Sequence, residues 1–195
     1  MTSFTDVFGD DSYHRLMDAC DDILKSVADD PQREGLHETP KRFAKAMMFY
    51  CQGYDQEPKD VLKVFEDGAE GVDEMVVVKD IPLYSLCEHH LAPFFGTVTI
   101  AYLPNGKVVG LSKLSRLAQV FARRLQVQER LTCQIADALM EHLQPKGCGV
   151  VVKARHMCME MRGVSQQGAV TITSALRGLF KDEPETRAEF MSLAR

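Results

Sequence analysis

The sequence predicts an α+β protein in which N-terminal helices precede a mostly antiparallel sheet. Three observations support this class. Apolar residues recur at spacings of three and four through the first fifty residues, as on helices with one buried face. From Met75 onward, β-branched runs with strand-like alternation replace that pattern. Two further amphipathic stretches then lie between the predicted strands, which gives the order helices, strands, helices, strands.

Two helices are expected near the N-terminus. The first has its apolar face within residues 13–27, with Asp10 or Asp11 as its cap, and ends by Asp30-Pro31. The second starts at Thr39 as N-cap, with Pro40 in the first helical position. Residues 54–73 are rich in Pro, Asp, Glu and Gly. They predict a boundary between an N-terminal helical region, residues 1–73, and a sheet domain, residues 74–195.

The sheet domain is expected to contain four strands and two long helices. The strands are predicted at 75–79, 96–102, 149–159 and 169–174, and the helices at 112–125 and 127–143. A short helix is expected over residues 185–195.

Composition excludes several classes of protein. The net charge of −5 argues against general nucleic-acid binding. No apolar run reaches the roughly 18 residues that span a bilayer, and the N-terminus lacks the basic start and apolar core of a signal peptide. We therefore expect a cytoplasmic protein whose six cysteines are reduced.

Two distant segments each carry a thiol beside an imidazole, the side chains that zinc prefers. Cys87 and His90 are three residues apart, with His89 between them, and His156 and Cys158 are two apart. On a strand, the second pair would share one face. Three ligands with an open position would make a catalytic zinc site, and four would make a structural one. Buried thiols with hydrogen-bonded histidines are the simpler alternative.

A basic cluster follows at the predicted start of a helix. Ser112 suits an N-cap, and Lys113 and Arg116 lie one turn apart on that same end, where free amide groups favour an anion. Arg162 could add a further guanidinium fork. Such a cluster suits phosphates, although a capped helix with a solvated basic face is the more common structure.

Gln128 and Glu129 stand at the start of the next predicted helix. A glutamate there is favourable for the helix dipole in any protein. Its two acceptor oxygens also match the adjacent N1–H and 2-amino donors of guanine.

Together these segments resemble the GTP cyclohydrolase I family. The resemblance covers residues 38–190 and depends on the order and spacing of several motifs. These are Glu38-Thr-Pro-Lys-Arg42, Ser85-Leu-Cys-Glu-His-His90, Gly110-Leu-Ser-Lys113, Gln126-Val-Gln-Glu-Arg-Leu131, His156-Met-Cys158 with Arg162-Gly163, and Gly178-Leu-Phe-Lys181.

The resemblance implies a T-fold: an antiparallel four-stranded sheet with two helices on one face, here preceded by N-terminal helices. It also implies a homodecamer of two stacked pentamers, with active sites between subunits and one zinc ion per subunit. It implies the following roles: zinc ligands Cys87, His90 and Cys158; catalytic histidines His89 and His156; triphosphate contacts Ser112, Lys113, Arg116, Arg162 and Arg42; guanine contacts Gln128 and Glu129.

The implied reaction converts GTP and water to 7,8-dihydroneopterin triphosphate and formate, the first step of tetrahydrofolate and pterin biosynthesis. Zinc would activate water, and His156 would protonate N7 of the base before attack at C8. Two alternatives remain at this stage. One is another T-fold enzyme, such as a nitrile reductase. The other is a nucleotide-binding scaffold with structural zinc, in which His156 is the fourth ligand.

Overall fold

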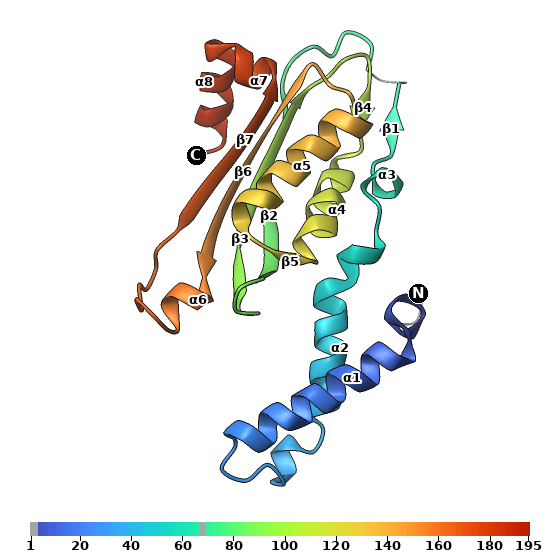
Figure 1. The fold of residues 1–195 in the computed structure, drawn as a ribbon. Coiled ribbons are helices and arrows are strands. Elements are labelled where there is room, and N and C mark those ends of the chain that lie inside the picture. Colours follow the sequence, from blue (N-terminus) through green and yellow to red (C-terminus); the bar gives the residue numbers. More distant parts are fainter. Residues whose placement is uncertain (1–3, 67–68) are drawn as a thin grey trace.

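The computed structural model describes residues 4–66 and 69–195 and shows one layer of helices on a twisted sheet (Figure 1). Helices and strands alternate in the predicted order. The α-helices are α1 Phe4–Val27, α2 Thr39–Cys51, α3 Pro58–Val61, α4 Leu111–Ala122, α5 Gln128–His142, α6 Met157–Glu160, α7 Leu179–Asp182 and α8 Pro184–Leu193. The strands are β1 Val64–Phe65, β2 Val76–Cys87, β3 Pro93–Leu103, β4 Val108–Val109, β5 Leu125–Gln126, β6 Gly147–His156 and β7 Thr171–Gly178. The short 3-10 helices η1 Glu34–Leu36 and η2 Gln52–Asp55 flank α2.

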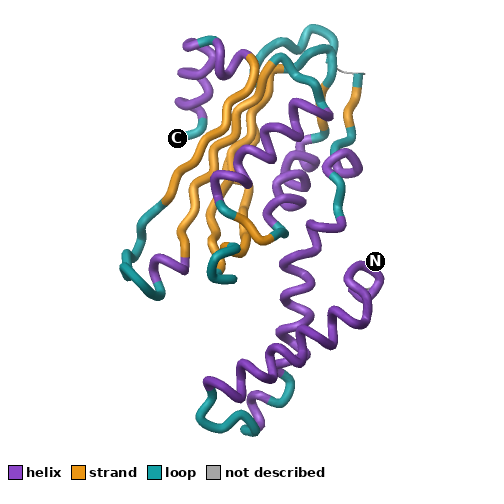
Figure 2. The backbone as a smooth tube through the Cα atoms, in the orientation of Figure 1, coloured by secondary structure: helices purple, strands orange, loops and turns teal. Residues whose placement is uncertain are grey.

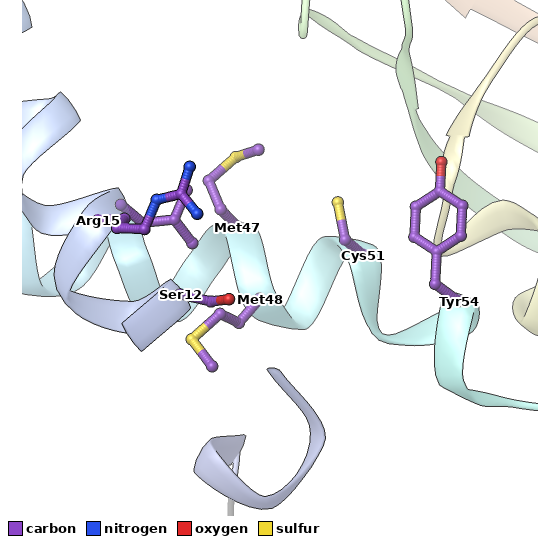
Figure 3. A pocket seen from close by; sticks show the side chains of 7 residues that line it. Ser12, Arg15, Met47, Met48, Cys51 and Tyr54 are labelled. Atoms are coloured by element: carbon purple, nitrogen blue, oxygen red, sulfur yellow. The ribbon is translucent and has the colours of Figure 1, made fainter. Parts of the chain in front are cut away.

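Helices α1 and α2 form a hairpin that extends away from the sheet (Figures 1 and 2). An open pocket of about 440 Å³ lies between them, with Ser12 and Arg15 on one side and Met47, Met48 and Cys51 on the other (Figure 3). Among the described residues, those lining this pocket include no member of the predicted zinc, histidine, guanine or phosphate sets. This pocket is therefore separate from the predicted site.

Three predicted helix caps are wrong. Asp10 and Asp11, one of which was expected to cap the first helix, both lie inside α1, which begins at Phe4. Thr39 is already helical in α2, and the residue before it, Glu38, makes no side-chain capping bond. Ser112 likewise lies inside α4, which begins after Gly110, also without a side-chain cap. Pro40 is near the start of α2 as expected, because a proline in the first turn removes only an amide that has no helical partner.

The sheet has the strand order β5-β2-β3-β6-β7. The four long strands are antiparallel, as the T-fold requires, and the two-residue β5 adds a parallel pairing with the end of β2. The pairs Leu86–Leu125 and Cys87–Gln126 attach the end of β2 to the segment between α4 and α5. Phe94 of β3 is the register partner of His156 of β6. The ends of β2 and β6, where the predicted metal residues occur, therefore meet at one end of the sheet.

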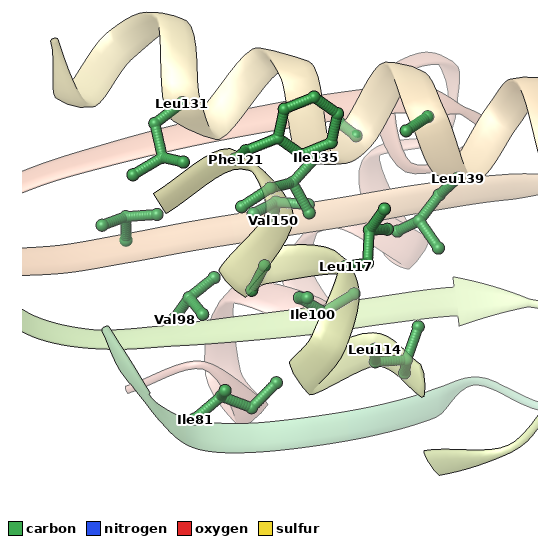
Figure 4. Packing of buried hydrophobic residues seen from close by; sticks show 14 of the residues in the cluster. Ile81, Val98, Ile100, Leu114, Leu117, Phe121, Leu131, Ile135, Leu139 and Val150 are labelled. Carbon is green, nitrogen blue, oxygen red and sulfur yellow. The ribbon is translucent and has the colours of Figure 1, made fainter. Parts of the chain in front are cut away.

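The core lies between the sheet and the pair α4 and α5 (Figure 4). Apolar residues at helical spacing, such as Leu114 and Leu117 on α4 and Ile135 and Leu139 on α5, are fully buried against the sheet. A buried Leu or Ile side chain contributes about 1.5–3 kcal/mol. This core fixes the position of the α5 N-terminus, which carries Gln128 and Glu129.

The C-terminal helices cover part of the opposite face of the sheet. Phe180 of α7 and Phe190 of α8 pack edge to face, with ring centroids 5.3 Å apart. A Cβ at Gly149 of β6 would lie 2.6 Å from the Phe190 ring, so only glycine allows these two rings to reach the strand. In the part of the chain that the structure describes, no helix has the length and apolar character needed to cross a bilayer.

Candidate active site

The first two predicted metal ligands lie on the turn between β2 and β3, residues 87–92, which we call the metal loop. The Cys87 carbonyl accepts hydrogen bonds from the amides of His90 (3.3 Å) and Leu91 (2.8 Å), and the Cys87 amide donates to Ala92 O at 2.8 Å. Leu91 closes the turn with a φ of 52°, in the left-handed region that non-glycine residues rarely adopt. This closed turn brings Cys87 and His90 together: Sγ and Nδ1 are 3.8 Å apart.

The third predicted ligand, Cys158, lies on the four-residue helix α6. The expectation that the strand continues to residue 159 is wrong, because β6 ends at His156 and the chain turns into α6. Arg155 holds this turn in place by donating from Nε to Glu160 Oε1 at 2.8 Å and from Nη2 to Glu160 Oε2 at 2.5 Å. The hydrogen bonds from Arg155 lower the pKa of Glu160. The helical turn, and not a shared strand face, brings Cys158 to the metal loop.

Cys87, His90 and Cys158 form a group whose ligand atoms all lie within 4.8 Å of one another. Two thiols and one imidazole suit zinc, whose tetrahedral ligands at 2.0–2.3 Å would be about 3.5–4 Å apart. The three side chains therefore fit a zinc ion with small adjustments. Without an ion, burial and then the nearby Cys87 raise the pKa of the Cys158 thiol, whereas a bound dication would favour its thiolate.

The metal loop is attached to the start of α5 by Arg130. Its guanidinium pairs with the Glu88 carboxylate and donates from Nε to Gln126 Oε1 at 3.0 Å. The Arg130 hydrogen bond lowers the pKa of Glu88. The Glu88 amide also donates to Gln126 O at 3.0 Å. These contacts connect the metal loop to the helix that begins with Gln128 and Glu129.

His156 ends β6 next to this group. Its ring lies parallel to that of Phe94, with centroids 4.7 Å apart and an interplanar angle of 4°. Its Nε2 is 2.7 Å from Gln128 Oε1. Burial lowers the pKa of His156, and the carboxylate of Glu129 opposes that effect. The histidine therefore sits in a partly desolvated position, with one nitrogen already bonded to the protein.

His89 and Glu129 lie around this centre. They are the remaining predicted catalytic histidine and the predicted guanine contact. His89 is exposed on the metal loop, with Nδ1 3.9 Å from Cys87 Sγ. Glu129 is exposed in the first turn of α5 and close enough to His156 to affect its pKa. Gln128, by contrast, is buried.

The predicted phosphate residues are dispersed in a single chain. Ser112, Lys113 and Arg116 lie in the first half of α4, and the metal loop pairs with β5, which follows the other end of that helix. Twelve residues of helix span about 18 Å. In Figure 1, α4 starts near β4 and ends near β5, so its first residues lie at the end of the helix away from β5. Arg42 is exposed on α2, in the extended hairpin, and Arg162 is exposed after α6.

Sequence reasoning missed two parts of the site. One is Phe94, whose stacking on His156 follows from strand register and has no sequence motif. The other is the Arg130–Glu88 pair, which joins residues 42 positions apart.

An antiparallel sheet with two helices on one face, and a three-ligand metal group at one end of that sheet, defines a T-fold protein with a candidate catalytic metal site. Comparison with known proteins identifies the family. The family model described as GTP cyclohydrolase I matches residues 16–195. The chain belongs to the GTP cyclohydrolase I family.

Two relatives named GTP cyclohydrolase 1 agree with that assignment. The chain is 59% identical over 173 residues to GTP cyclohydrolase 1 of Janthinobacterium sp. (strain Marseille), covering 89% of this chain and 87% of that one. It is 54% identical over 182 residues to GTP cyclohydrolase 1 of Rattus norvegicus, covering 92% of this chain and 74% of the other. A solved structure of the archaeosine synthase QueF-Like in the apo form matches with a TM-score of 0.41 and 17% identity, over 53% of this chain and 93% of that one.

Proposed function

We propose that this chain is a zinc-dependent GTP cyclohydrolase I. It converts GTP and water to 7,8-dihydroneopterin triphosphate and formate in the cytoplasm, at the start of tetrahydrofolate and pterin synthesis. The observation that carries this proposal is the meeting of Cys87, His90 and Cys158 next to a partly buried His156. Family membership supports the same activity.

In this proposal Cys87, His90 and Cys158 hold one zinc ion per subunit. When bound, zinc supplies the Lewis acidity that turns water into a nucleophile near neutral pH. Three protein ligands would be the number found in catalytic zinc sites, which bind water or substrate as well. The structural-zinc alternative needs His156 as a fourth ligand, whereas the group of ligand atoms within 4.8 Å of one another contains, among the described residues, Cys87, His90 and Cys158 and not His156.

His156 acts as the general acid. Protonation of N7 makes C8 of the guanine electrophilic, and a histidine is suited to this transfer. Water adds at C8, the C8–N9 bond breaks, and C8 leaves as formate after a second hydrolysis. The ribose carbons then rearrange and close the new ring with loss of water, so that one water is consumed overall. His89 assists the proton transfers of the later steps.

Glu129 recognises the base. Its exposed carboxylate at the α5 N-terminus accepts the N1–H and 2-amino hydrogens of guanine. The resemblance implies a guanine contact for Gln128 as well.

Ser112, Lys113, Arg116, Arg162 and Arg42 bind the triphosphate, which is not hydrolysed. Because the start of α4 lies about one helix length from the metal loop, we propose that a neighbouring subunit supplies its α4 residues and Arg42. A homodecamer of two stacked pentamers with active sites between subunits satisfies this requirement. The outer strand β7, with Ile172 61% exposed, is available for pairing with another copy.

The direct test is incubation of zinc-replete protein with GTP. We expect formate release and, after oxidation, a fluorescent pterin, both abolished by a chelator and restored by zinc. Absence of both products from protein with one zinc per subunit would refute the proposed activity. A mass measurement in solution tests the decamer separately.

A further inference from the structure

Gln128 is the first residue of α5, and its side chain is 1% exposed. Its Nε2 lies 3.1 Å from Val152 O, 3.0 Å from Thr171 O and 3.1 Å from Thr173 Oγ1. Two of these three neighbours are carbonyl oxygens, which only accept hydrogen bonds. The amide NH₂ group must therefore face them, and the oxygen Oε1 must face His156.

Two threonines exclude the flipped orientation of this amide. Thr132 Oγ1 donates its hydrogen to Gln128 O at 2.7 Å, because that carbonyl can only accept. The contact of 2.6 Å between Thr132 Oγ1 and Thr173 Oγ1 must then use the Thr173 hydrogen. Thr173 consequently has only its lone pairs left for Gln128. A flipped amide would place Oε1 against three acceptors.

The orientation of Gln128 decides the tautomer of His156. Oε1 can only accept, so the His156 Nε2 at 2.7 Å must carry a hydrogen. The neutral ring is then the Nε2–H tautomer, with its free lone pair on Nδ1. The parallel Phe94 ring fixes the ring plane, and the Gln128 bond fixes rotation within that plane.

We propose that Gln128 is a positioning residue that binds the Nε2–H of His156, so that Nδ1 is the nitrogen that carries the exchangeable proton toward the substrate. The proposal rests on the proposed role of His156 in opening the guanine ring of GTP. It differs from the guanine contact that the resemblance implies for Gln128, because the Gln128 side-chain amide is already bonded to Val152, Thr171, Thr173 and His156.

The test separates kcat from KM in two variants. Gln128→Leu removes the acceptor for His156, and Gln128→Glu keeps one, because even a protonated carboxyl retains a carbonyl oxygen for Nε2–H. We expect Gln128→Leu to lower kcat by about 10²-fold or more, in the range of general acid–base effects, with little change in KM. Gln128→Glu should remain within about tenfold of the parent protein. Gln119→Leu, on the exposed side of α4, is the matched control and should behave like the parent.

A guanine contact predicts the opposite pattern. Gln128→Leu would then raise KM and remove the preference for GTP over ITP, while kcat stays normal. That result would show that Gln128 contacts the guanine base, and the proposal would be wrong. Unchanged kcat and KM in a folded Gln128→Leu protein would also overturn it. If Gln128→Leu does not fold, the same comparison is made on Gln128→Glu, where a raised KM with lost GTP preference overturns the proposal.

A binding measurement keeps this result distinct from the proposed activity. Calorimetric titration of GTP into the chelated protein, in which turnover is abolished, measures binding alone, and we expect Gln128→Leu and the parent to bind GTP with Kd values within about threefold. A loss of affinity of tenfold or more indicates a substrate contact and contradicts the positioning role. Absence of formate from the parent protein refutes the proposed activity and leaves this affinity comparison valid.

Discussion

The metal side and the histidine side of the site are held in different ways. On the metal side, His90 is exposed and its Nδ1 makes a sulfur contact of 3.8 Å, which is weak. On the histidine side, His156 has a 2.7 Å hydrogen bond and a stacked ring. Gln128, which makes that bond, is itself buried and bonded to two strands. The difference teaches that the fold alone orients His156, the proposed proton-transfer residue, whereas the exposed His90 depends on the ion for its final geometry.

Removal of one metal ligand should have the largest effect. We expect Cys158→Ser to lose zinc and to lower formate release by more than about 10³-fold, since a metal contributes several kcal/mol to such a reaction. Zinc content and formate yield are measured on the same preparation. Cys133→Ser, an exposed thiol on α5, should keep both, and loss of zinc in that variant would show a different ligand set.

Removal of the proposed proton donor should affect the reaction and not the metal. We expect His156→Ala to keep one zinc per subunit and to lower formate release by about 10²- to 10⁴-fold. Metal analysis and kinetics check the two parts separately. His142→Ala, at the end of α5, is the control with normal activity. Zinc loss from His156→Ala would show that His156 is a fourth ligand, and the contrast between the metal side and the histidine side would then be wrong.

Glu129→Gln tests the proposed contact with the guanine base, which lies between the metal side and the histidine side of the site. A hydrogen bond to a charged group contributes about 1.5–3 kcal/mol, so we expect GTP binding to weaken about 10- to 100-fold. ITP lacks the 2-amino group and should be affected less. Glu141→Gln, exposed on the same helix, is the control. Equal weakening of GTP and ITP would contradict guanine recognition by Glu129.

Arg130→Met should have the smallest effect. It breaks the pair with Glu88 and releases the metal loop from α5, and we expect zinc affinity to fall about tenfold, as for residues that support metal ligands. Competition with a chelator measures this affinity. Lys25→Met removes an ion pair with Asp21 on α1 and should leave zinc affinity unchanged. Unchanged affinity in Arg130→Met would mean that backbone pairing with β5 alone holds the loop.

The order of helices and strands could be predicted from the sequence because apolar residues recur at a different spacing in each type of element. The change at Met75 marked the start of the sheet region, and the apolar faces of residues 112–143 marked the two helices that cover it. The Cys87 and His90 pair was visible because a short turn joins the two residues.

The rest depends on contacts between distant segments. Gln128 meets Val152, Thr171 and Thr173 across 24, 43 and 45 residues, so spacing gives no sign of that network. The predicted strand face for His156 and Cys158 failed because α6 begins directly after His156. The Arg155–Glu160 pair that stabilises this turn looked like an ordinary pair of surface charges.

The most direct test of the contrast between the two sides is histidine-ring NMR of the full-length protein, with zinc bound and after chelation. Comparison with His156→Ala assigns the His156 signals. We predict that zinc removal changes the ring signals of His90 and leaves His156 as the Nε2–H tautomer, because Gln128 holds it without the ion. A His156 ring that becomes a mixture of tautomers after chelation would contradict the account, because the metal would then orient both sides.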